Sequence, residues 1–257
     1  MKRVTLLTDF GTVDGYVAAM KGVAAGIAPG VILDDASHEI PPGNLQAAAW
    51  AVAAYWDRYP VGAVHMVVVD PGVGGRRRPL ALCCDGRFLV GPDNGVFTRV
   101  IRAAKEWRAV AIENADIMGD VISFTFHGRD IFMPAAAHLA NGTPLESLGP
   151  AVADPVMLDL PEAVDDGAMI TGAIVHADRF GNLVTSVPGG MVNGREVVVQ
   201  IRGRRLPLHC TYADVGRGHL VALVGSHGCV EIAVRDGSAA AMLGAGRGDT
   251  VTVTAAG

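Results

Sequence analysis

The sequence predicts a two-domain protein, with a mostly parallel α/β domain first and a smaller all-β domain after it. Through the first half of the 257-residue chain, apolar strand-like segments alternate with helix-like segments. This alternation is the pattern of βαβ units, which build parallel sheets. After residue 168, short strand-like segments are separated by glycines at a spacing that fits a barrel or sandwich of about 90 residues.

The first domain is expected to cover residues 1–150. Residues 79–90 are predicted to form a hairpin, because Asp85-Gly86 is a typical two-residue turn between strands. The loop Pro92–Gly95 carries side chains that could cap the helix after it. The other expected strands are 4–7, 31–35 and 64–69, and the expected helices are 14–27, 44–58, 96–105 and 131–140.

The second domain is expected to cover residues 169–257. Residues 151–168 are rich in proline, glycine and acidic side chains and lack a regular apolar period, so they are predicted to form a linker. Beyond the linker, the strand-like segments are 170–176, 196–201, 219–223, 230–234 and 250–254.

The composition narrows the classes of function. Half of the residues are hydrophobic, so the chain can bury a large core, and the net charge of -5 argues against binding nucleic acid through a basic face. No signal peptide and no apolar run long enough to span a membrane is apparent. The four cysteines include no CxxC pair, which predicts reduced thiols, no zinc site and a cytoplasmic location. The expected ligand is a small molecule.

Residues with acidic, basic or imidazole side chains follow three apolar segments of the first domain. Asp70 and three arginines come after the apolar run that ends at Val69, and Thr8–Gly11 follows the first strand, with Asp14 and Lys21 close behind. His127, Arg129 and Asp130 are expected between an apolar strand and an alanine-rich helix. Alone, Asp70 and the arginines are equally well explained as a turn cap and a solvated surface run. Because ligands bind beyond the carboxyl ends of such strands, three segments together predict one site.

Two loops of the second domain carry further candidates. Asp178–Asn182 and Gly225–Gly228 each join strand-like segments, and their residues are ordinary turn formers. Phe180 is unusual in a polar turn. It could stack on a heterocycle or simply anchor the loop.

Six motifs carry a resemblance to a known family: TDFG (Thr8–Gly11), VVDPGVG (Val68–Gly74), PDNG (Pro92–Gly95), TFHGRDIF (Thr125–Phe132), DRFGNLVTS (Asp178–Ser186) and GSHG (Gly225–Gly228). Together they resemble the S-adenosyl-L-methionine (SAM) hydroxide adenosyltransferases, SAM hydrolases related to the SAM-dependent fluorinases and chlorinases. The resemblance implies an α/β N-terminal domain, a C-terminal β-barrel and a homotrimer that holds SAM between neighbouring subunits. It implies that water attacks C5′ of SAM and releases adenosine and methionine, with no cofactor and no metal.

The catalytic triad implied by the resemblance is Asp70, Arg77 and His127. Water is a poor nucleophile at neutral pH, so a group must accept its proton while a cation stabilises the developing hydroxide. The choice of Arg77 over Arg76 and Arg78 stays open on sequence alone. So does the base; Asp70 is favoured, with Arg77 and His127 positioning the water.

The resemblance also implies the residues that bind SAM. Asp14 matches the carboxylate that holds the ribose diol, and Asp9 either supports it or caps the helix. Asp178 and Ser226 match the residues for the methionine ammonium and carboxylate. His227 is at the position where fluorinase-like relatives have an arginine. Because histidine donates fewer hydrogen bonds than arginine, weaker binding of the methionine carboxylate is expected.

The adenine contacts are assigned to the second domain by the same resemblance. Asn182 matches the residue at the adenine edge, and Phe180 and Tyr212 would flank the purine. Two alternatives remain: a protein that binds SAM or adenosine without converting it, and a SAM-dependent halogenase. The halogenase is disfavoured because Ala136 falls near the position of a halide-binding serine.

Overall fold

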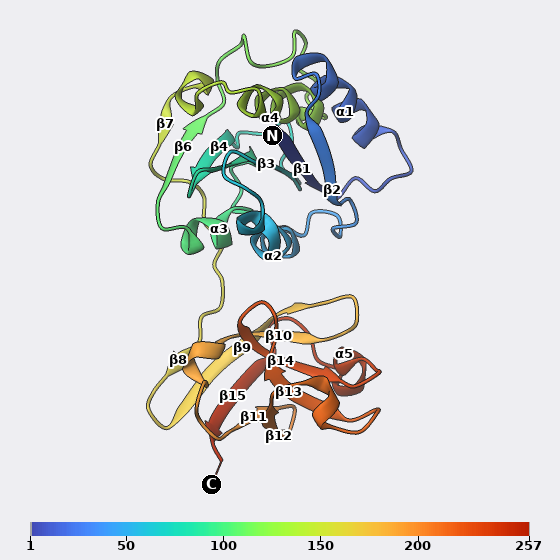
Figure 1. Ribbon diagram of the computed structural model, residues 1–257, viewed down its shortest axis with the longest axis vertical. Helices are drawn as coiled ribbons and strands as arrows, with labels where there is room; N and C mark the ends of the chain where they lie inside the picture. Colours follow the sequence, from blue (N-terminus) through green and yellow to red (C-terminus); the bar gives the residue numbers. More distant parts are fainter. Residues whose placement is uncertain (1, 257) are drawn as a thin grey trace. The chain divides into compact units, whose positions relative to one another are not determined.

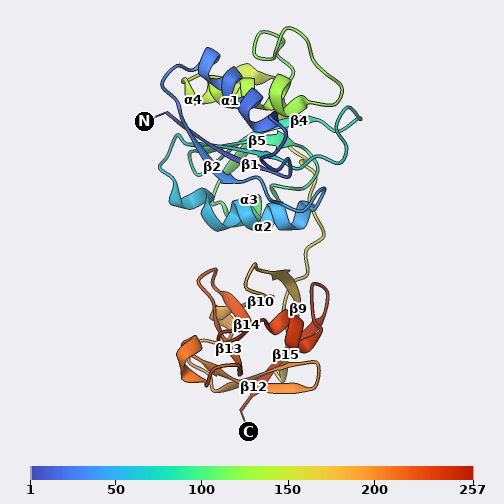
Figure 2. The ribbon, with the colours of Figure 1, turned by 90° about the vertical axis from the view of Figure 1, so that its right-hand side faces the viewer.

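The computed structural model describes residues 2–256. The chain divides into two compact units, Met1–Leu158 and Asp159–Gly257, and Figures 1 and 2 show the ribbon of each. The division falls inside the stretch 151–168, where the sequence places a linker. No helix in the described part of the chain is long and apolar enough to cross a membrane.

The first unit is built on a seven-stranded sheet with the order β2-β1-β3-β5-β4-β6-β7. The first four strands in this order are parallel to one another. Each of the last three strands pairs antiparallel with the strand before it in this order. The predicted α/β class is therefore confirmed. The strands are β1 (Arg3–Thr8), β2 (Ile32–Ser37), β3 (Val64–Val68), β4 (Pro79–Cys84), β5 (Arg87–Pro92), β6 (Trp107–Ala111) and β7 (Ala151–Val152).

Helices cover both faces of this sheet (Figures 1 and 2). α1 (Tyr16–Ile27) and α4 (Met133–Ala140) share one face and contact each other, while α2 (Leu45–Tyr55) and α3 (Thr98–Ala103) cover the other. All residues of β3 are buried, as expected for a strand covered on both faces. Short helical turns complete the unit: η1 (Trp56–Arg58), η2 (Gly128–Phe132, a π-helical turn) and η3 (Leu145–Leu148).

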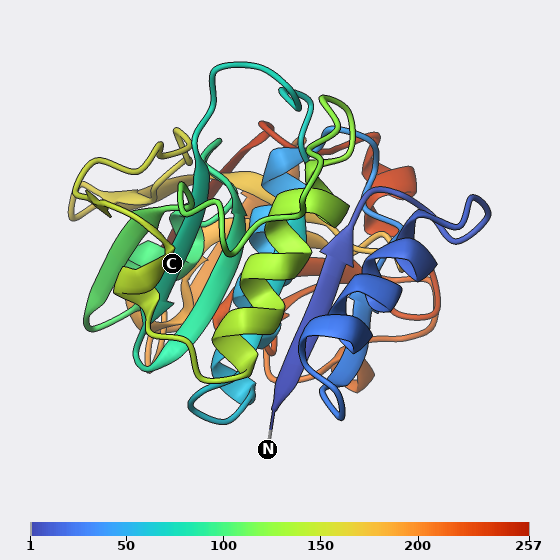
Figure 3. The same ribbon diagram turned by 90° about the horizontal axis from the view of Figure 1, so that it is seen from above.

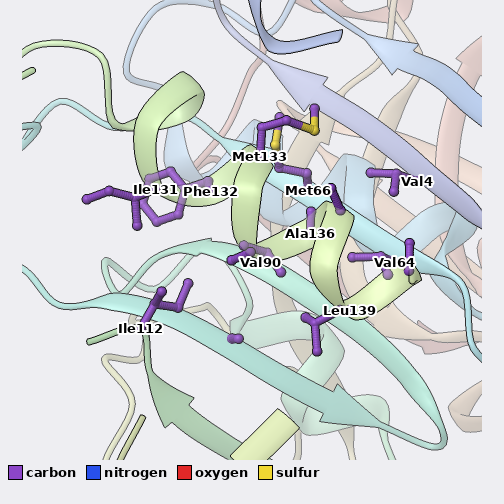
Figure 4. Close-up of a cluster of buried hydrophobic side chains, with 14 of the residues drawn as sticks. Val4, Val64, Met66, Val90, Ile112, Ile131, Phe132, Met133, Ala136 and Leu139 are labelled. Carbon is purple, nitrogen blue, oxygen red and sulfur yellow. The ribbon is translucent and has the colours of Figure 1, made fainter. Parts of the chain in front are cut away.

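The core under α4 shows why the alanine-rich segment is needed. Figure 4 shows Ala136 of α4 among the side chains of Val64 and Met66, with Phe132 nearby. Ala136 is completely buried. Small side chains on this face let the helix lie close to the sheet, and close packing excludes water from beneath the loops that carry the candidate site.

Local sequence signals predicted the hairpin correctly. Asp85 and Gly86 both have positive φ, 45° and 76°, which is the backbone of a type I′ turn between β4 and β5. The Asp85 carboxylate also accepts the amide hydrogens of Lys105 and Glu106. The expected helix 96–105 is shorter than predicted, and β6 was missed because Trp107 and Arg108 at its start are exposed.

The apolar strand expected before His127 is wrong. Residues 112–126 form a loop, in which Val121 and Phe124 are 80% and 81% exposed. The amide of Ser123 donates to the Asp130 carboxylate at 2.9 Å instead of to a neighbouring strand. Asp130 thus anchors the loop from the helical turn that follows it.

The second unit is a closed barrel, which decides between the two predicted architectures. Its strand order is β10-β14-β13-β12-β11-β15-β9, and pairing of β9 with β10 closes the ring. Closure leaves no free edge among these strands. They are β9 (Met169–Ala177), β10 (Leu183–Pro188), β11 (Val197–Ile201), β12 (Arg204–His209), β13 (Leu220–Val224), β14 (Cys229–Val234) and β15 (Thr250–Ala255).

Short elements surround the barrel. β8 (Val164–Asp165) pairs with β9, and α5 (Ala239–Leu243) begins after Ser238, whose hydroxyl accepts the Ala241 amide. The turns η4 (Gly189–Met191) and η5 (Tyr212–Asp214) connect strands. Sequence analysis missed β10 and β12; β12 carries a proline and exposed arginines, which are unusual in a strand.

Candidate active site

The centre of the candidate site is Asp70, two residues beyond the end of β3. Its carbonyl accepts the Val73 amide, which starts a turn, and its carboxylate side chain is only 5% exposed. Figure 3 shows the segment after β3 looping out at the same end of the sheet as the segment after β1. Parallel strands bring their carboxyl ends together in this way.

Gly74 lets two loops of the site meet. Its φ is 74°, and a Cβ there would lie 2.3 Å from the carbonyl oxygen of Phe124. Only glycine therefore fits where the loop after β3 passes the loop before His127.

Arg77 joins Asp70 to His127. Its Nε lies 3.0 and 3.1 Å from the two carboxylate oxygens of Asp70, and its Nη2 donates to Asp70 Oδ2 and lies 2.7 Å from His127 Nδ1. The Arg77 side chain is 10% exposed and its Cζ lies 5.3 Å from the ring centre of Phe132. A forked, nearly buried guanidinium of this kind is held in one orientation.

The contact with Arg77 defines the protonation state of His127. Arginine can only donate hydrogen bonds, so His127 Nδ1 must accept and the hydrogen of the neutral ring lies on Nε2. Burial and the positive charge of Arg77 lower the pKa of His127 below its usual 6.5. The ring is therefore neutral at pH 7, with an N–H available to donate from Nε2.

The other charged residues around the triad hold the loops. Arg78 binds Asp93 at 2.7 Å and Asp154 at 2.9 Å, so among the neighbouring arginines it is Arg77 that contacts both Asp70 and His127. Arg129 binds Asp130 at 2.6 Å. Burial raises the pKa of Asp130, but the hydrogen bonds from Arg129 and Ser123 outweigh this effect and lower it.

A pocket of about 250 Å³ lies beside α1 in the first unit. Asp14 is exposed at its edge, whereas Asp9 is turned away and accepts the Gly43 amide at 2.8 Å. The pocket is lined by Gly11, Thr12, Asp14, Gly15, Val17, Ala18, Lys21, Asp35 and His38.

A polar chain that sequence reasoning missed supports this pocket. Asp35 accepts from Lys21 at 2.6 Å and from His38 Nε2 at 3.0 Å, and His38 Nδ1 lies 2.8 Å from the Thr8 hydroxyl. The Thr8 hydroxyl oxygen also accepts the Phe10 amide. His38 and Thr8 are buried, so this chain fixes the turn between β1 and α1. The motif around Thr8 was visible in the sequence, but its link to Asp35 and His38 needed the fold.

In the second unit, Asp178 organises the turn after β9. Its Oδ1 accepts the amides of Phe180 and Asn182, and its Oδ2 accepts from Asn182 Nδ2 at 2.9 Å. These bonds leave Phe180 75% exposed. The turn therefore presents an aromatic face from a rigid base.

The remaining candidates of the second unit lie near Glu231 of β14. Tyr212 and His227 both bind its carboxylate, and Ser226 is exposed in the turn between β13 and β14. Sequence reasoning did not single out Glu231. Its only signal was an acidic residue within an otherwise apolar strand.

Ala136 of α4 lies wholly in the core, among the side chains of Val64 and Met66. Within residues 2–256, no group of three or more His, Cys, Asp or Glu side chains is arranged to hold a metal ion.

Comparisons with known proteins show which family this chain resembles. Residues 4–149 match the SAM hydroxide adenosyltransferase N-terminal domain, and residues 172–252 match the C-terminal domain. A protein named (R)-S-adenosyl-L-methionine hydrolase from Thermus thermophilus is 43% identical over 95% of this chain and 96% of its own. One of the same name from Salinispora tropica is 41% identical over 98% and 97%.

A more distant relative and a solved structure are also similar to this chain over nearly its full length. A fluorinase from Actinoplanes is 27% identical, over 98% of this chain and 97% of its own. The crystal structure of an uncharacterised conserved protein from Thermotoga maritima superposes with a TM-score of 0.91 at 32% identity, covering 98% of this chain and 99% of the other. This chain therefore belongs to the SAM hydroxide adenosyltransferase family.

Proposed function

We propose that this protein hydrolyses SAM to adenosine and L-methionine through attack of water on C5′ of the ribose. The observation that carries the proposal is the Arg77 guanidinium, which joins the Asp70 carboxylate to a neutral His127. Together these groups offer a proton acceptor and several donors to one water molecule. Relatives named as hydrolases of SAM, 39–43% identical to this chain, support the same reaction.

Asp70 is the proposed base. His127 is less suited to that role, because Arg77 engages its Nδ1 lone pair and its Nε2 already carries a hydrogen. As the water oxygen bonds to C5′, its proton passes to Asp70 and the electron pair of the C5′–S bond goes to sulfur. Methionine then leaves as a neutral thioether, so the leaving group needs no acid. The N–H groups of Arg77 and His127 stabilise the developing hydroxide.

The proposed contacts of the sugar and the adenine fit the chemistry of the side chains. Asp14, exposed at the edge of the pocket, would accept from the ribose diol, with Asp9 holding the loop. Asn182 must point its Nδ2 at the Asp178 carboxylate, because a carboxylate only accepts. Its Oδ1 is thus the atom suited to the adenine amino group. Phe180 and Tyr212 are the proposed purine-stacking residues.

The methionine part is assigned to Asp178, Ser226 and His227, with no cofactor and no metal. Two further proposals are a homotrimer with sites at subunit interfaces, supported by the resemblance, and a cytoplasmic location, supported by the absence of a CxxC pair among the four cysteines. Light scattering after size-exclusion chromatography checks the trimer: the expected mass is about three times 26.6 kDa.

Turnover in ¹⁸O-labelled water tests the function. Purified protein is incubated with SAM, with and without chloride, and the products are separated and weighed by mass spectrometry. The proposal expects methionine together with adenosine that carries ¹⁸O at its 5′ hydroxyl in both buffers. Bound but unconverted SAM would favour a sensing protein instead. Chlorinated adenosine would identify a halogenase.

A further inference from the structure

Glu231 is a buried carboxylate at the centre of the second unit's polar cluster. It lies on β14, opposite Val184 of β10 and Leu223 of β13, and is 4% exposed. Its Oε1 accepts from the Tyr212 hydroxyl at 2.7 Å, and its Oε2 lies 2.9 Å from His227 Nε2. One side chain therefore contacts two proposed SAM-binding residues.

The cluster is built around this carboxylate. A Cβ on Gly225 would lie 2.5 Å from His227 Nε2 and 2.7 Å from Glu231 Oε2, so the turn needs glycine for the two side chains to meet. Burial raises the pKa of Glu231, but the hydrogen bonds from His227 and Tyr212 outweigh it and lower that pKa. A buried acid with an ionised form this well satisfied is a stable negative charge.

Besides Cys229, which begins β14 itself, the titratable groups that face Glu231 and His227 come from two further segments. Tyr212 lies in η5, and Asp178 follows β9. Burial and the neighbouring Glu231 raise the pKa of Tyr212 to about 12, with a smaller contribution from Asp178, so the phenol stays protonated and donates.

The two nitrogens of His227 favour different states of the ring. The Cys229 amide lies 3.3 Å from Nδ1, a contact that needs a neutral ring, whereas the ionised Glu231 at 2.9 Å from Nε2 favours the imidazolium. Burial alone lowers the pKa of His227, but hydrogen bonds with the side chains of Cys229 and Glu231, together with the charge of Glu231, raise it to about 9. The shorter contact with a buried charge prevails over the long amide contact.

We propose that Glu231 is a positioning residue for SAM binding: its carboxylate fixes Tyr212 and His227 together and supplies the charge that makes His227 a cationic group for the substrate carboxylate. This inference rests on the proposed function. If His227 is charged, the weaker binding of the methionine carboxylate that was expected from a histidine in place of arginine no longer applies. A charged imidazolium binds a carboxylate more strongly than a neutral ring does, because hydrogen bonds between charged partners are the stronger ones.

Glu231→Gln tests the inference without substrate. The neutral amide must present its NH₂ group to either Tyr212 or His227, so it no longer favours the imidazolium. Imidazole ¹³C resonances are titrated in histidine-labelled protein, and His227→Gln assigns the signal among eight histidines. We expect the pKa of His227 to fall from about 9 to below 6.5 in Glu231→Gln. Glu196→Gln, an exposed glutamate before β11, is the matched control and should leave the pKa unchanged.

Kinetics supply the functional test. At pH 7.5, Glu231→Gln should raise the KM for SAM about tenfold, the loss typical of one charge-assisted hydrogen bond, with kcat within about twofold of wild type. A purely structural role would instead lower kcat and thermal stability together. An unchanged KM and an unchanged pKa of His227 would overturn the proposal.

If Glu231→Gln does not fold, the wild type and His227→Gln still decide the question. The ratio of their KM values for SAM is followed from pH 6 to pH 10, which cancels titration of SAM itself. A ratio that approaches one as the pH rises through about 9 supports a cationic His227, and a constant ratio overturns it. If SAM is not converted at all, the proposed function fails, whereas the substrate-free titration of His227 still tests the role of Glu231.

Discussion

Replacing Asp70 by asparagine separates the roles within the triad. The carboxylate is 5% exposed and accepts from Arg77 through Nε and Nη2, so an amide of equal size keeps the shape but loses the basic oxygen and the negative charge. General-base catalysis contributes about 10²–10⁴-fold to a rate. We therefore expect kcat for SAM hydrolysis to fall about 10³-fold, which is about 4 kcal/mol of barrier.

His127→Asn is the matched comparison. The asparagine oxygen can replace Nδ1 as the acceptor for Arg77, so only the Nε2–H donor is lost. We expect a smaller fall in kcat, about 10-fold to 10²-fold, because one donor to the developing hydroxide is removed. Asp116→Asn, an exposed aspartate in the loop before His127, should change nothing.

The assay is chromatography of adenosine and methionine at saturating SAM, with circular dichroism to verify folding. Folding must be checked because Asp70→Asn leaves the buried Arg77 without its counter-charge, and breaking such a pair costs about 3–5 kcal/mol. If folded Asp70→Asn keeps kcat within tenfold of wild type, or if His127→Asn loses as much, Asp70 is not the base.

Three other outcomes follow from the same contacts. Arg77→Lys should lower kcat/KM at least 10²-fold, because one ammonium cannot reproduce the fork that holds Asp70 and His127 together; near-normal turnover would contradict this. The value of kcat should fall as the pH drops below 6.5, since protonation of His127, whose pKa is lowered, removes the acceptor for Arg77; a pH–rate profile of His127→Asn should lack this acid limb. Gly74→Ala should lower the free energy of unfolding by about 1–3 kcal/mol because of its positive φ and the Phe124 carbonyl, whereas Gly22→Ala within α1, where a Cβ meets no atom within 4 Å, should raise it by about 0.5–1 kcal/mol; urea melts compare the two.

Several elements were predictable because their cause is local. The hairpin at Asp85-Gly86 follows from residues that accept positive φ, and β3 follows from an uninterrupted apolar run. The loop before His127 was mistaken for a strand because its apolar residues suggest burial. In the fold, Phe124 is exposed and the Asp130 carboxylate takes the backbone amide that a strand would have used.

The candidate site was also only partly predictable from the sequence. The family resemblance implied Asp70, Arg77 and His127 but left Arg76 and Arg78 as rivals, because three adjacent arginines differ only in what they contact. The fold brings Arg77 to Asp70 and His127, and places Arg78 against Asp93.

The order of residues along this chain was sufficient to establish the α/β and all-β halves, the main turns and the family, because these depend on apolar period, turn chemistry and motif spacing. The tautomer of His127, the link from Asp35 through His38 to Thr8, and the pairing of Glu231 with Tyr212 and His227 emerged only from the folded chain. Each depends on the direction of a hydrogen bond between residues that are distant in sequence or come from different elements, or on the burial that strengthens a charge. Neither the direction of a hydrogen bond nor the burial of a charge can be deduced from the spacing of residues along the chain.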